Sequence, residues 1–356
     1  MDESTRAVYE THAAEWAERR PPSLVDEAAS FSRRVLPGRP IVDVGSGAGG
    51  YFPFLRRPLV GLDGARAMLL AGRGVAADVP VVQGDLEALP FAPRRLGGAW
   101  ARASYLHLRR FDLPAALAHL QHALAVGAPL EMTLRAGTGE GPLPNDDFPG
   151  RFFARWEAEE LAPLLLGAGF TVDELSRSKD WVTVRARAAR TLPDFVGPGM
   201  RLLICGLNPS VVSADRGFGY AGATNRFWRA AVLSGVIAEA HARQPFLVLA
   251  RDRVGMTDLV KRATPRASEL QPADYRAGAA RVAALVAWLR PEAVVFVGLA
   301  GYRAAIDRAA HAGWQEVPFG GVDAYVMPST SGLNAATSLG ALVEHLQAAH
   351  SKRDGS

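Results

Sequence analysis

Cysteine is nearly absent from this sequence of 356 residues, which contains only Cys205. One cysteine excludes an internal disulfide and any zinc or iron–sulfur site built from clustered cysteines. Long hydrophobic runs are absent too, because stretches such as Ala293–Val297 are far shorter than the roughly 18 to 20 residues that cross a bilayer. We therefore expect no metal site and no membrane partner.

The first residues of the sequence, Met1–Thr5, lack the basic start and apolar core of a signal peptide, so we expect a cytoplasmic location. The isoelectric point is about 9.4. Residues 201–356 hold 17 basic and 12 acidic side chains, whereas residues 1–200 hold 23 and 24. This excess favours a nucleic-acid partner for the second half. The alternative is that the isoelectric point reflects genomic base composition, since the chain is rich in arginine and alanine and has only three lysines.

The length suggests two domains, each large enough to bury its own core. Short apolar runs alternate with helical stretches in both halves, which favours parallel, doubly wound sheets. A segment rich in proline and glycine, 191–200, interrupts the pattern. The sequence therefore predicts an α/β fold class with two three-layer domains, 1–188 and 191–350. Expected strands lie at 40–44, 57–62, 79–82, 96–100, 201–205, 293–297 and 323–326, with a hairpin over 170–184. Expected helices lie at 157–169, 225–237, 272–289, 301–312 and 336–349, and an apolar segment near 246–249 has no assigned type.

A glycine-rich turn follows the first expected strand and contains Gly45, Gly47 and Gly49. Glycines allow the backbone to turn sharply there and to approach a nucleoside ligand closely. Asp63 closes the second strand, where a carboxylate can accept hydrogen bonds from ribose hydroxyls. This combination predicts a cofactor crevice in the first half.

Asp85 and Leu86 follow the third strand, where a carboxylate and a backbone N–H can reach an adenine. Together with Asp43 and the glycine turn, they make residues 5–187 resemble class I S-adenosylmethionine-dependent methyltransferases. The resemblance implies a Rossmann-like fold and S-adenosylmethionine as cofactor. A plain dinucleotide-binding domain is the alternative, although it would favour the Gly-x-Gly-x-x-Gly spacing. His107 is a candidate base, and a packing histidine is the simpler interpretation.

In the second half, a strand leads into Gly206, Leu207, Asn208 and Pro209. Substrate sites of parallel sheets lie at this end of the strands. Pro209 keeps Asn208 out of helical geometry and directs its side chain into the crevice. A structural Asn-Pro turn is the alternative.

Two aromatic residues, Phe218 and Tyr220, come shortly after this turn. A second polar loop follows the strand at 323–326 and contains Ser329, Ser331, Gly332, Leu333 and Asn334. Both loops resemble those of the mismatch-specific uracil/thymine-DNA glycosylases of the Mug branch, and the resemblance covers nearly all of 191–349.

The resemblance implies that Asn208 orients the attacking water without a cofactor and that Tyr220 stacks on an extruded base. Leu333 is then the wedge that replaces the base, while Ser329, Ser331 and Gly332 lie near the phosphates and base. The implied partners are double-stranded DNA with a mismatched or damaged pyrimidine and downstream enzymes that process abasic sites. High-turnover uracil glycosylases have Asp and His where this chain has Asn208 and Ser329, which implies a slower enzyme.

Three further features refine this expectation. The second half has only Lys261 and Lys352 as amine nucleophiles, which predicts a monofunctional enzyme that leaves an abasic site. Ser210 stands where the Mug-type pattern usually has Gly, and Ala335 stands where it has an Arg that reads the region of the opposite guanine. The resemblance therefore implies uracil opposite guanine as substrate more strongly than thymine. A methyltransferase for a small molecule or RNA, with a second half that only binds nucleic acid, is the alternative function.

Overall fold

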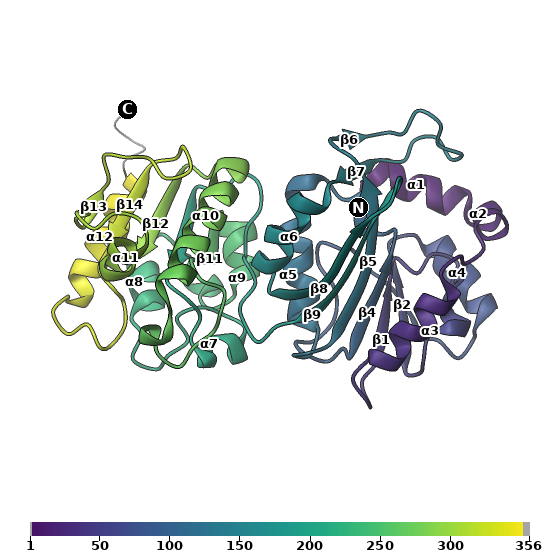
Figure 1. The fold of residues 1–356 in the computed structure, drawn as a ribbon, viewed down its shortest axis with the longest axis horizontal. Coiled ribbons are helices and arrows are strands. Elements are labelled where there is room, and N and C mark those ends of the chain that lie inside the picture. Colours follow the sequence, from purple (N-terminus) through teal and green to yellow (C-terminus); the bar gives the residue numbers. More distant parts are fainter. Residues whose placement is uncertain (1, 352–356) are drawn as a thin grey trace. The chain divides into compact units, whose positions relative to one another are not determined.

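The computed structural model describes residues 2–351 and divides the chain into two compact units. The first unit runs through Leu166 and resumes at Phe170–Ala189, and the second consists of Gly167–Gly169 and the chain from Arg190 onward. Each unit has a sheet with helices packed on it (Figure 1). No helix within residues 2–351 combines the length and apolarity that a bilayer crossing requires.

The first unit has a mixed sheet whose centre is parallel, with the strand order β3-β2-β1-β4-β5-β7-β6. The hairpin of β8 and β9 joins this sheet because β9 pairs antiparallel with β5. The strands are β1 Ile41–Val44, β2 Leu59–Asp63, β3 Val81–Gln83, β4 Gly98–Arg102, β5 Pro129–Ala136, β6 Glu140–Gly141, β7 Phe153–Trp156, β8 Phe170–Arg177 and β9 Trp181–Ala188. Every residue of β1 is buried, as expected for a parallel strand covered on both faces.

The helices of the first unit lie on both faces of its sheet (Figure 1). They are α1 Glu3–Thr11, α2 Ala13–Arg19, α3 Val25–Arg34, α4 Arg66–Val75, α5 Leu113–Ala123 and α6 Ala158–Gly167. The core includes Phe31, Phe52 and Trp100, which are almost fully buried. The predicted Rossmann-like fold class is confirmed. The central strand β5 had no counterpart among the expected strands.

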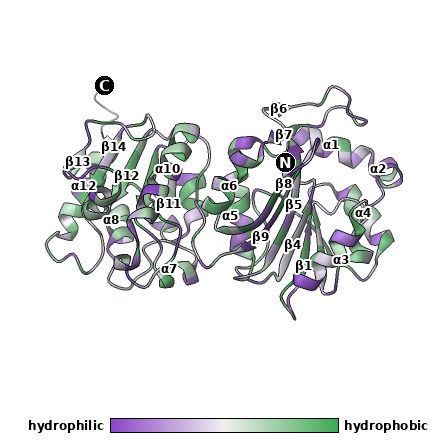
Figure 2. Ribbon diagram, in the orientation of Figure 1, coloured by the Kyte–Doolittle hydropathy of each residue, from purple (hydrophilic) through white to green (hydrophobic). Residues whose placement is uncertain are grey.

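The second unit has a sheet with the strand order β11-β10-β12-β14-β13, parallel except for β13. The strands are β10 Leu202–Gly206, β11 Val254–Asp258, β12 Ala293–Val297, β13 Gly313–Trp314 and β14 Ala324–Met327. The helices are α7 Val211–Arg216, α8 Phe227–Leu233, α9 Pro245–Leu247, α10 Pro272–Leu289, α11 Leu299–Ala305 and α12 Leu339–Ser351. Strand β12 is hydrophobic along its whole length (Figure 2).

Two segments of the second unit differ from the expected elements. The apolar segment near 246–249 is helical, as α9 and the π-turn Val248–Asp252, and the strand β11 begins only at Val254. A short apolar run has no periodicity that separates a strand from a buried helix. The proline- and glycine-rich segment 191–200 is also more than a linker, because buried Phe195 exchanges two backbone hydrogen bonds with Met256.

The strand order decides where the polar loops of the second unit meet. Strands β10 and β14 flank β12, and β11 lies on the other side of β10. Because these strands are parallel, the segments after β10, β11 and β14 leave from the same edge of the sheet. The two loops predicted to form a site therefore share one edge with Asp258, the last residue of β11.

Candidate functional site

The backbone after β10 is fixed by the chain that follows β11. The carbonyl oxygens of Gly206 and Leu207 accept the N–H groups of Leu259 and Val260, each at 2.9 Å. The Pro209 carbonyl accepts the N–H of Thr264 at 3.2 Å. The parallel pairing of the two strands thus continues into the loop, so Asn208 starts from a rigid backbone.

The Asn208 side chain is held through its nitrogen. Nδ2 donates to the Thr264 hydroxyl at 2.8 Å, to the Arg262 carbonyl at 3.0 Å and to the Pro209 carbonyl at 3.2 Å. The Thr264 hydroxyl donates to the Arg266 carbonyl, so it accepts from Asn208. All three partners require a donor, which fixes the amide orientation. Within residues 2–351 no group donates to Oδ1, which leaves this oxygen as a fixed acceptor.

Tyr220 and Asp258 lie together against Gly206. A Cβ added to Gly206 would lie 2.5 Å from Oδ1 of Asp258 and 3.1 Å from the Tyr220 hydroxyl, so only glycine fits there. The Tyr220 ring stacks on Phe227 with centroids 4.1 Å apart and planes at 20°. One face of the Tyr220 ring is thus covered by Phe227. The buried hydroxyl of Tyr220 has no hydrogen-bond partner among residues 2–351.

A buried ionic cluster formed by Asp194, Lys261 and Arg281 lies next to Asp258. The Asp194 carboxylate accepts from Lys261 Nζ at 2.9 Å and from the Thr257 hydroxyl at 2.6 Å, and it also pairs with Arg281. Arg281 donates to the Asp258 carbonyl at 2.7 Å. Lys261 is buried and paired, so its amine is not available as a nucleophile. Lys352, the other lysine of this half, lies outside the described residues.

Burial raises the pKa of the Asp258 carboxyl to about 6, with Lys261 opposing the rise, Asp194 adding to it and Arg281 opposing it. Cys205 and Tyr220 also face this carboxyl. Both are neutral near pH 6, because burial raises the pKa of each. The fold therefore keeps a proton on Asp258 in the window between the ordinary pKa of 3.8 and about 6, where the unfolded chain has lost it.

Because the folded protein binds this proton more tightly than the unfolded chain does, we predict that the free energy of unfolding falls as the pH rises from 3.8 to about 6. Asp258→Asn, which mimics the neutral acid, should raise the melting temperature at pH 8 relative to wild type and change it less at pH 5. The measurement is thermal unfolding at both pH values. Asp274→Asn is the control of opposite sign, because hydrogen bonds from the Gln271 N–H and from Arg262 lower the pKa of Asp274. An Asp258→Asn effect equal at both pH values would contradict the prediction.

The loop after β14 is tied to the start of α8 by Arg226. Its guanidinium donates to the carbonyls of Asn334 at 2.7 Å and Ser331 at 3.2 Å, and to that of Thr337. Its backbone N–H donates to the Thr330 carbonyl at 3.0 Å. The two predicted loops are thereby joined into one structure.

Inside this loop the polar side chains bond to one another. The Ser329 hydroxyl accepts the N–H of Ser331, and the Ser331 hydroxyl accepts the N–H of Leu333. Asn334 donates to the Ser329 carbonyl at 2.8 Å. A Cβ at Gly332 would lie 2.4 Å from the Thr224 hydroxyl, so the loop packs closely there. Leu333 is presented from this fixed loop with 97% of its surface exposed.

The remaining predicted residues of this half have other surroundings. Leu207 packs against α11, since a Cβ at Gly301 would lie 2.8 Å from its Cδ1. Phe218 packs against the core and contacts Trp228 edge-on. Ser210 caps α7, because its hydroxyl accepts the Ser213 N–H at 3.1 Å. This cap gives Ser210 a local structural role.

Sequence reasoning assigned no role to Asp258 or Thr264 and left Arg226 unassigned. Asp258 could have been found as an acid that ends a strand, as Asp63 was. Thr264 contacts Asn208, which lies 56 residues away along the chain, and the Arg226 guanidinium contacts Ser331, 105 residues away. No spacing pattern identifies such pairs.

The first unit contains a cavity of about 550 Å³ at the carboxyl ends of β1, β2 and β4. Three buried polar atoms on its lining residues lack partners within residues 2–351: Oδ2 of Asp43 and the hydroxyls of Ser46 and Ser104. Gly45 has a φ of +71°, and a Cβ there would lie 2.3 Å from the Ser104 Cβ. Burial, with the charge of Asp63 adding to it, raises the pKa of Asp43 to about 8. A cationic ligand would satisfy this buried acid.

The other predicted cofactor residues fall into two groups. Gly45, Gly47, Asp63 and Leu86 line the cavity with Asp43. Asp63 accepts the N–H groups of Gly47 at 2.9 Å and Ala65 at 2.8 Å. Gly49 has a φ of +73° and packs against Phe52, whose ring would lie 2.7 Å from an added Cβ. Asp85 is exposed, and its carboxylate accepts the Glu87 N–H. The structure thus brings the first group together and leaves Gly49 and Asp85 outside the cavity lining.

His107 lines the same cavity with both ring nitrogens in use. Nδ1 lies 2.7 Å from the Phe152 carbonyl, which only accepts, so this nitrogen carries the hydrogen. Nε2 lies 2.7 Å from the Tyr9 hydroxyl and is therefore the acceptor. Burial lowers the pKa of His107 to about 4. These contacts favour the packing interpretation of His107 over that of a base.

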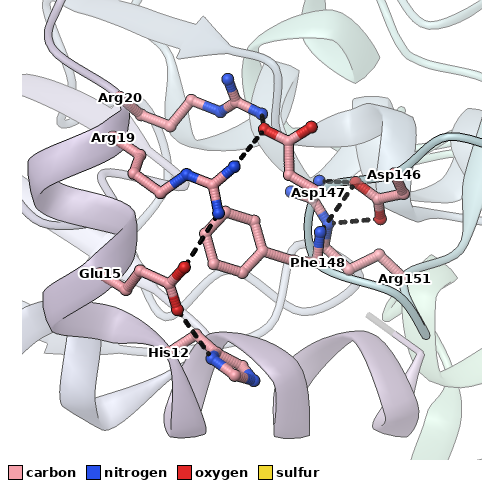
Figure 3. Close-up of polar contacts among 8 residues, drawn as sticks. All are labelled: His12, Glu15, Arg19, Arg20, Asp146, Asp147, Phe148 and Arg151. Atoms are coloured by element: carbon pink, nitrogen blue, oxygen red, sulfur yellow. Dashed lines mark hydrogen bonds and ion pairs between the residues drawn. The ribbon is translucent and has the colours of Figure 1, made fainter.

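A polar cluster joins the end of α2 to the segment 146–151 (Figure 3), and several of its members line the cavity. Asp147 pairs with Arg19 at 3.3 Å and with Arg20, and Asp146 pairs with Arg151. Arg151 also donates to the Tyr9 hydroxyl at 3.0 Å. These contacts hold one wall of the cavity in place.

Comparison with known proteins gives separate results for the two halves. Residues 193–350 match the family model described as the Uracil DNA glycosylase superfamily. Similar solved structures include the CcbJ methyltransferase from Streptomyces caelestis, with 19% identity over 53% of this chain and 100% of that chain and a TM-score of 0.43. A DhpI complex with S-adenosylhomocysteine has 20% identity over 52% of this chain and 96% of that chain, with a TM-score of 0.41.

A third similar structure is the Burkholderia thailandensis 1,6-didemethyltoxoflavin-N1-methyltransferase with S-adenosylhomocysteine, at 17% identity over 52% of this chain and 88% of that chain, with a TM-score of 0.42. The strand order of the first unit describes a Rossmann-like α/β sheet. Residues 193–350 of this chain therefore match the uracil DNA glycosylase superfamily, and a Rossmann-like unit precedes them in the sequence.

Proposed function

We propose that the second unit is a monofunctional, mismatch-specific DNA glycosylase that removes uracil opposite guanine and leaves an abasic site for downstream repair enzymes. The observation that carries the proposal is the fixed amide of Asn208, whose nitrogen is anchored and whose oxygen is left to accept. The match of residues 193–350 to the glycosylase superfamily supports the reaction class. The resemblance of both loops to the Mug branch supports the choice of mismatched pyrimidines.

In this mechanism the N-glycosidic bond breaks first and its electron pair leaves with the base. Oδ1 of Asn208 accepts a hydrogen bond from a water molecule, whose oxygen then bonds to the sugar carbon while its proton passes to solvent or to the departing base. An amide orients water without taking its proton. Tyr220 stacks on the extruded base, and Leu333 fills the gap that it leaves.

The test uses a duplex with one G·U pair, heated in alkali after incubation with the full protein. Wild type should cause strand scission, and Asn208→Ala should reduce the rate by about a hundredfold, as for the loss of one positioned polar group. A duplex with G·C at the same site is the control. No scission by wild type would favour the alternative, in which this half only binds nucleic acid.

The buried ion pair of Lys261 predicts the absence of lyase activity. Borohydride added during the reaction should trap no covalent protein–DNA adduct, because a Schiff base needs a free amine. The measurement is a gel-shifted band that survives denaturation. A bifunctional glycosylase under the same conditions is the positive control, and a trapped band with this protein would refute the prediction.

For the first unit we propose S-adenosylmethionine as ligand. Burial raises the pKa of the Asp43 and Asp63 carboxyl groups, and a cationic ligand beside them would favour their ionised form. The hydroxyls of Ser46 and Ser104, which lack partners within residues 2–351, offer further hydrogen bonds. The ligand would supply an electrophilic methyl group. The residues of this chain bind and orient it, and the cavity wall excludes water.

A further inference from the structure

Two arginines stand side by side on the wall of the first unit's cavity. Arg102 ends β4 and lies beside Thr133 of β5, to whose hydroxyl it donates at 2.8 Å. Arg135 is two residues farther along β5, on the same face as Thr133 because side chains alternate along a strand. Trp181 of β9 is directly opposite Arg135. Both guanidinium groups lie over the Trp181 ring, at 4.6 and 5.1 Å from its centroid.

These two arginines lack the strong partners that other arginines of the unit have. On the same sheet face, Arg185 and Arg34 share the buried carboxylate of Glu131. Within the described part of the chain, the acidic partner of Arg135 is Asp180, at 4.0 Å. The Asp180 side chain is 56% exposed, so this ion pair is weak in water. For Arg102 we find no carboxylate partner within residues 2–351.

The acids that line the cavity have other partners. Asp146 pairs with Arg151, and Asp147 pairs with Arg19 and Arg20. Asp43 and Asp63 lie at the glycine turn, where the proposed cationic ligand binds. The cavity therefore contains, besides the carboxyl groups at the glycine turn, two arginines without a close buried acid.

The lining also limits the size and character of a second ligand. Helix α2 and the segment 146–151 close one side of the cavity through the contacts in Figure 3. Apolar side chains line it as well, among them Leu106, Leu143 and Phe153. A volume of about 550 Å³ that also holds a nucleoside ligand leaves room for a small molecule and not for a nucleic-acid strand.

We propose that Arg102 and Arg135, backed by Trp181, bind a small organic anion, a carboxylic acid with an apolar body, as the methyl acceptor of the first unit. Paired guanidinium groups bind carboxylates through charge-assisted hydrogen bonds. The inference rests on the proposed binding of S-adenosylmethionine, because that ligand defines which part of the cavity is left for the methyl acceptor. The carboxylate of S-adenosylmethionine itself is the alternative anion for these two arginines.

The experiment uses the full protein and two separate readouts. Calorimetry with S-adenosylhomocysteine tests the cofactor end. Ligand-observed NMR on the protein saturated with S-adenosylhomocysteine then tests benzoate as the acid probe and benzamide as its uncharged counterpart. We expect benzoate to bind at least about tenfold more tightly than benzamide, as one charge-assisted contact would give.

Arg102→Gln and Arg135→Gln should each weaken benzoate binding by about tenfold and change S-adenosylhomocysteine affinity by less than about threefold. Arg187→Gln is the matched control, since this arginine of β9 pairs with Asp173 and does not line the cavity. Equal binding of the two probes, or none of either, would overturn the anion site. Loss of S-adenosylhomocysteine affinity in both variants would overturn it too, by assigning the arginines to the cofactor's carboxylate. Failure of wild type to bind S-adenosylhomocysteine would refute the proposed cofactor, whereas benzoate preference without it would still support the anion site.

Discussion

Replacing Asn208 with Asp is expected to slow uracil excision by about a hundredfold, the effect of losing one positioned polar group. High-turnover uracil glycosylases use Asp in this loop, so a faster enzyme would be the simple expectation from resemblance. Here, however, the amide nitrogen donates to the carbonyls of Pro209 and Arg262 and to a hydroxyl that itself donates elsewhere. A carboxylate would place oxygen against oxygen and lose all three hydrogen bonds.

The measurement is the single-turnover rate on a G·U duplex, with DNA affinity measured in parallel. Asn225→Asp is the matched control, because Oδ1 of Asn225 accepts the Phe227 N–H at 2.9 Å and a carboxylate can do the same. It should keep the wild-type rate within about threefold, since its acceptor role is retained. An Asn208→Asp variant as fast as wild type would mean that the anchored amide does not determine the rate.

The second large effect is expected for Leu333→Ala. An apolar wedge replaces stacking worth a few kcal/mol per step, so truncation should slow excision from duplex DNA by about tenfold to a hundredfold. Excision from single-stranded DNA should change much less, because no stack has to be opened there. The melting temperature should not change, since 97% of the Leu333 surface is exposed.

The ratio of duplex to single-strand rates is the measurement that isolates the wedge. Val317→Ala is the matched control, because Val317 is an apolar residue that is 75% exposed and lies outside both loops. Its ratio should equal that of wild type. If Leu333→Ala slowed both substrates alike, Leu333 would contribute to binding or folding and not to base extrusion.

Much of the fold follows from local patterns. Strands β1 and β12 lie within a residue of their expected bounds, and α10 has the expected bounds, because each has a clear period and clear end residues. Helix α8 is shorter than expected, since it starts after the Asn225 turn and ends before Gly235, whose φ is +75°. The strand β11 was not among the expected strands, and the apolar segment near 246–249, which had no assigned type, is helical, because four residues are too few to show a periodicity.

In the candidate sites, too, some residues are predictable from local sequence patterns and others are not. The glycine turn, Asn208 and Leu333 are recognisable because each follows a strand within a few residues or lies in a short polar loop, and Asp43 because it lies in the strand that leads into the glycine turn. The residues that hold two of these groups in place come from distant segments: Thr264 contacts Asn208, and Arg226 contacts the loop of Leu333. Arg102 and its partner Trp181 were not recognisable from the sequence for the same reason. Asp85 shows the reverse case, because its place after a strand predicts a role but its side chain is exposed and outside the cavity lining.

The sequence by itself determined two α/β units, the absence of clustered cysteines and a polar amide after a buried strand. These depend on composition and on spacing within a few residues. Only the tertiary structure decided that the amide is anchored through its nitrogen, that Lys261 is paired with Asp194, that His107 has both nitrogens in use and that two arginines share one cavity wall. Hydrogen bonds and ion pairs form between atoms that are close in space, and the strand order brings those atoms together from segments far apart in the chain.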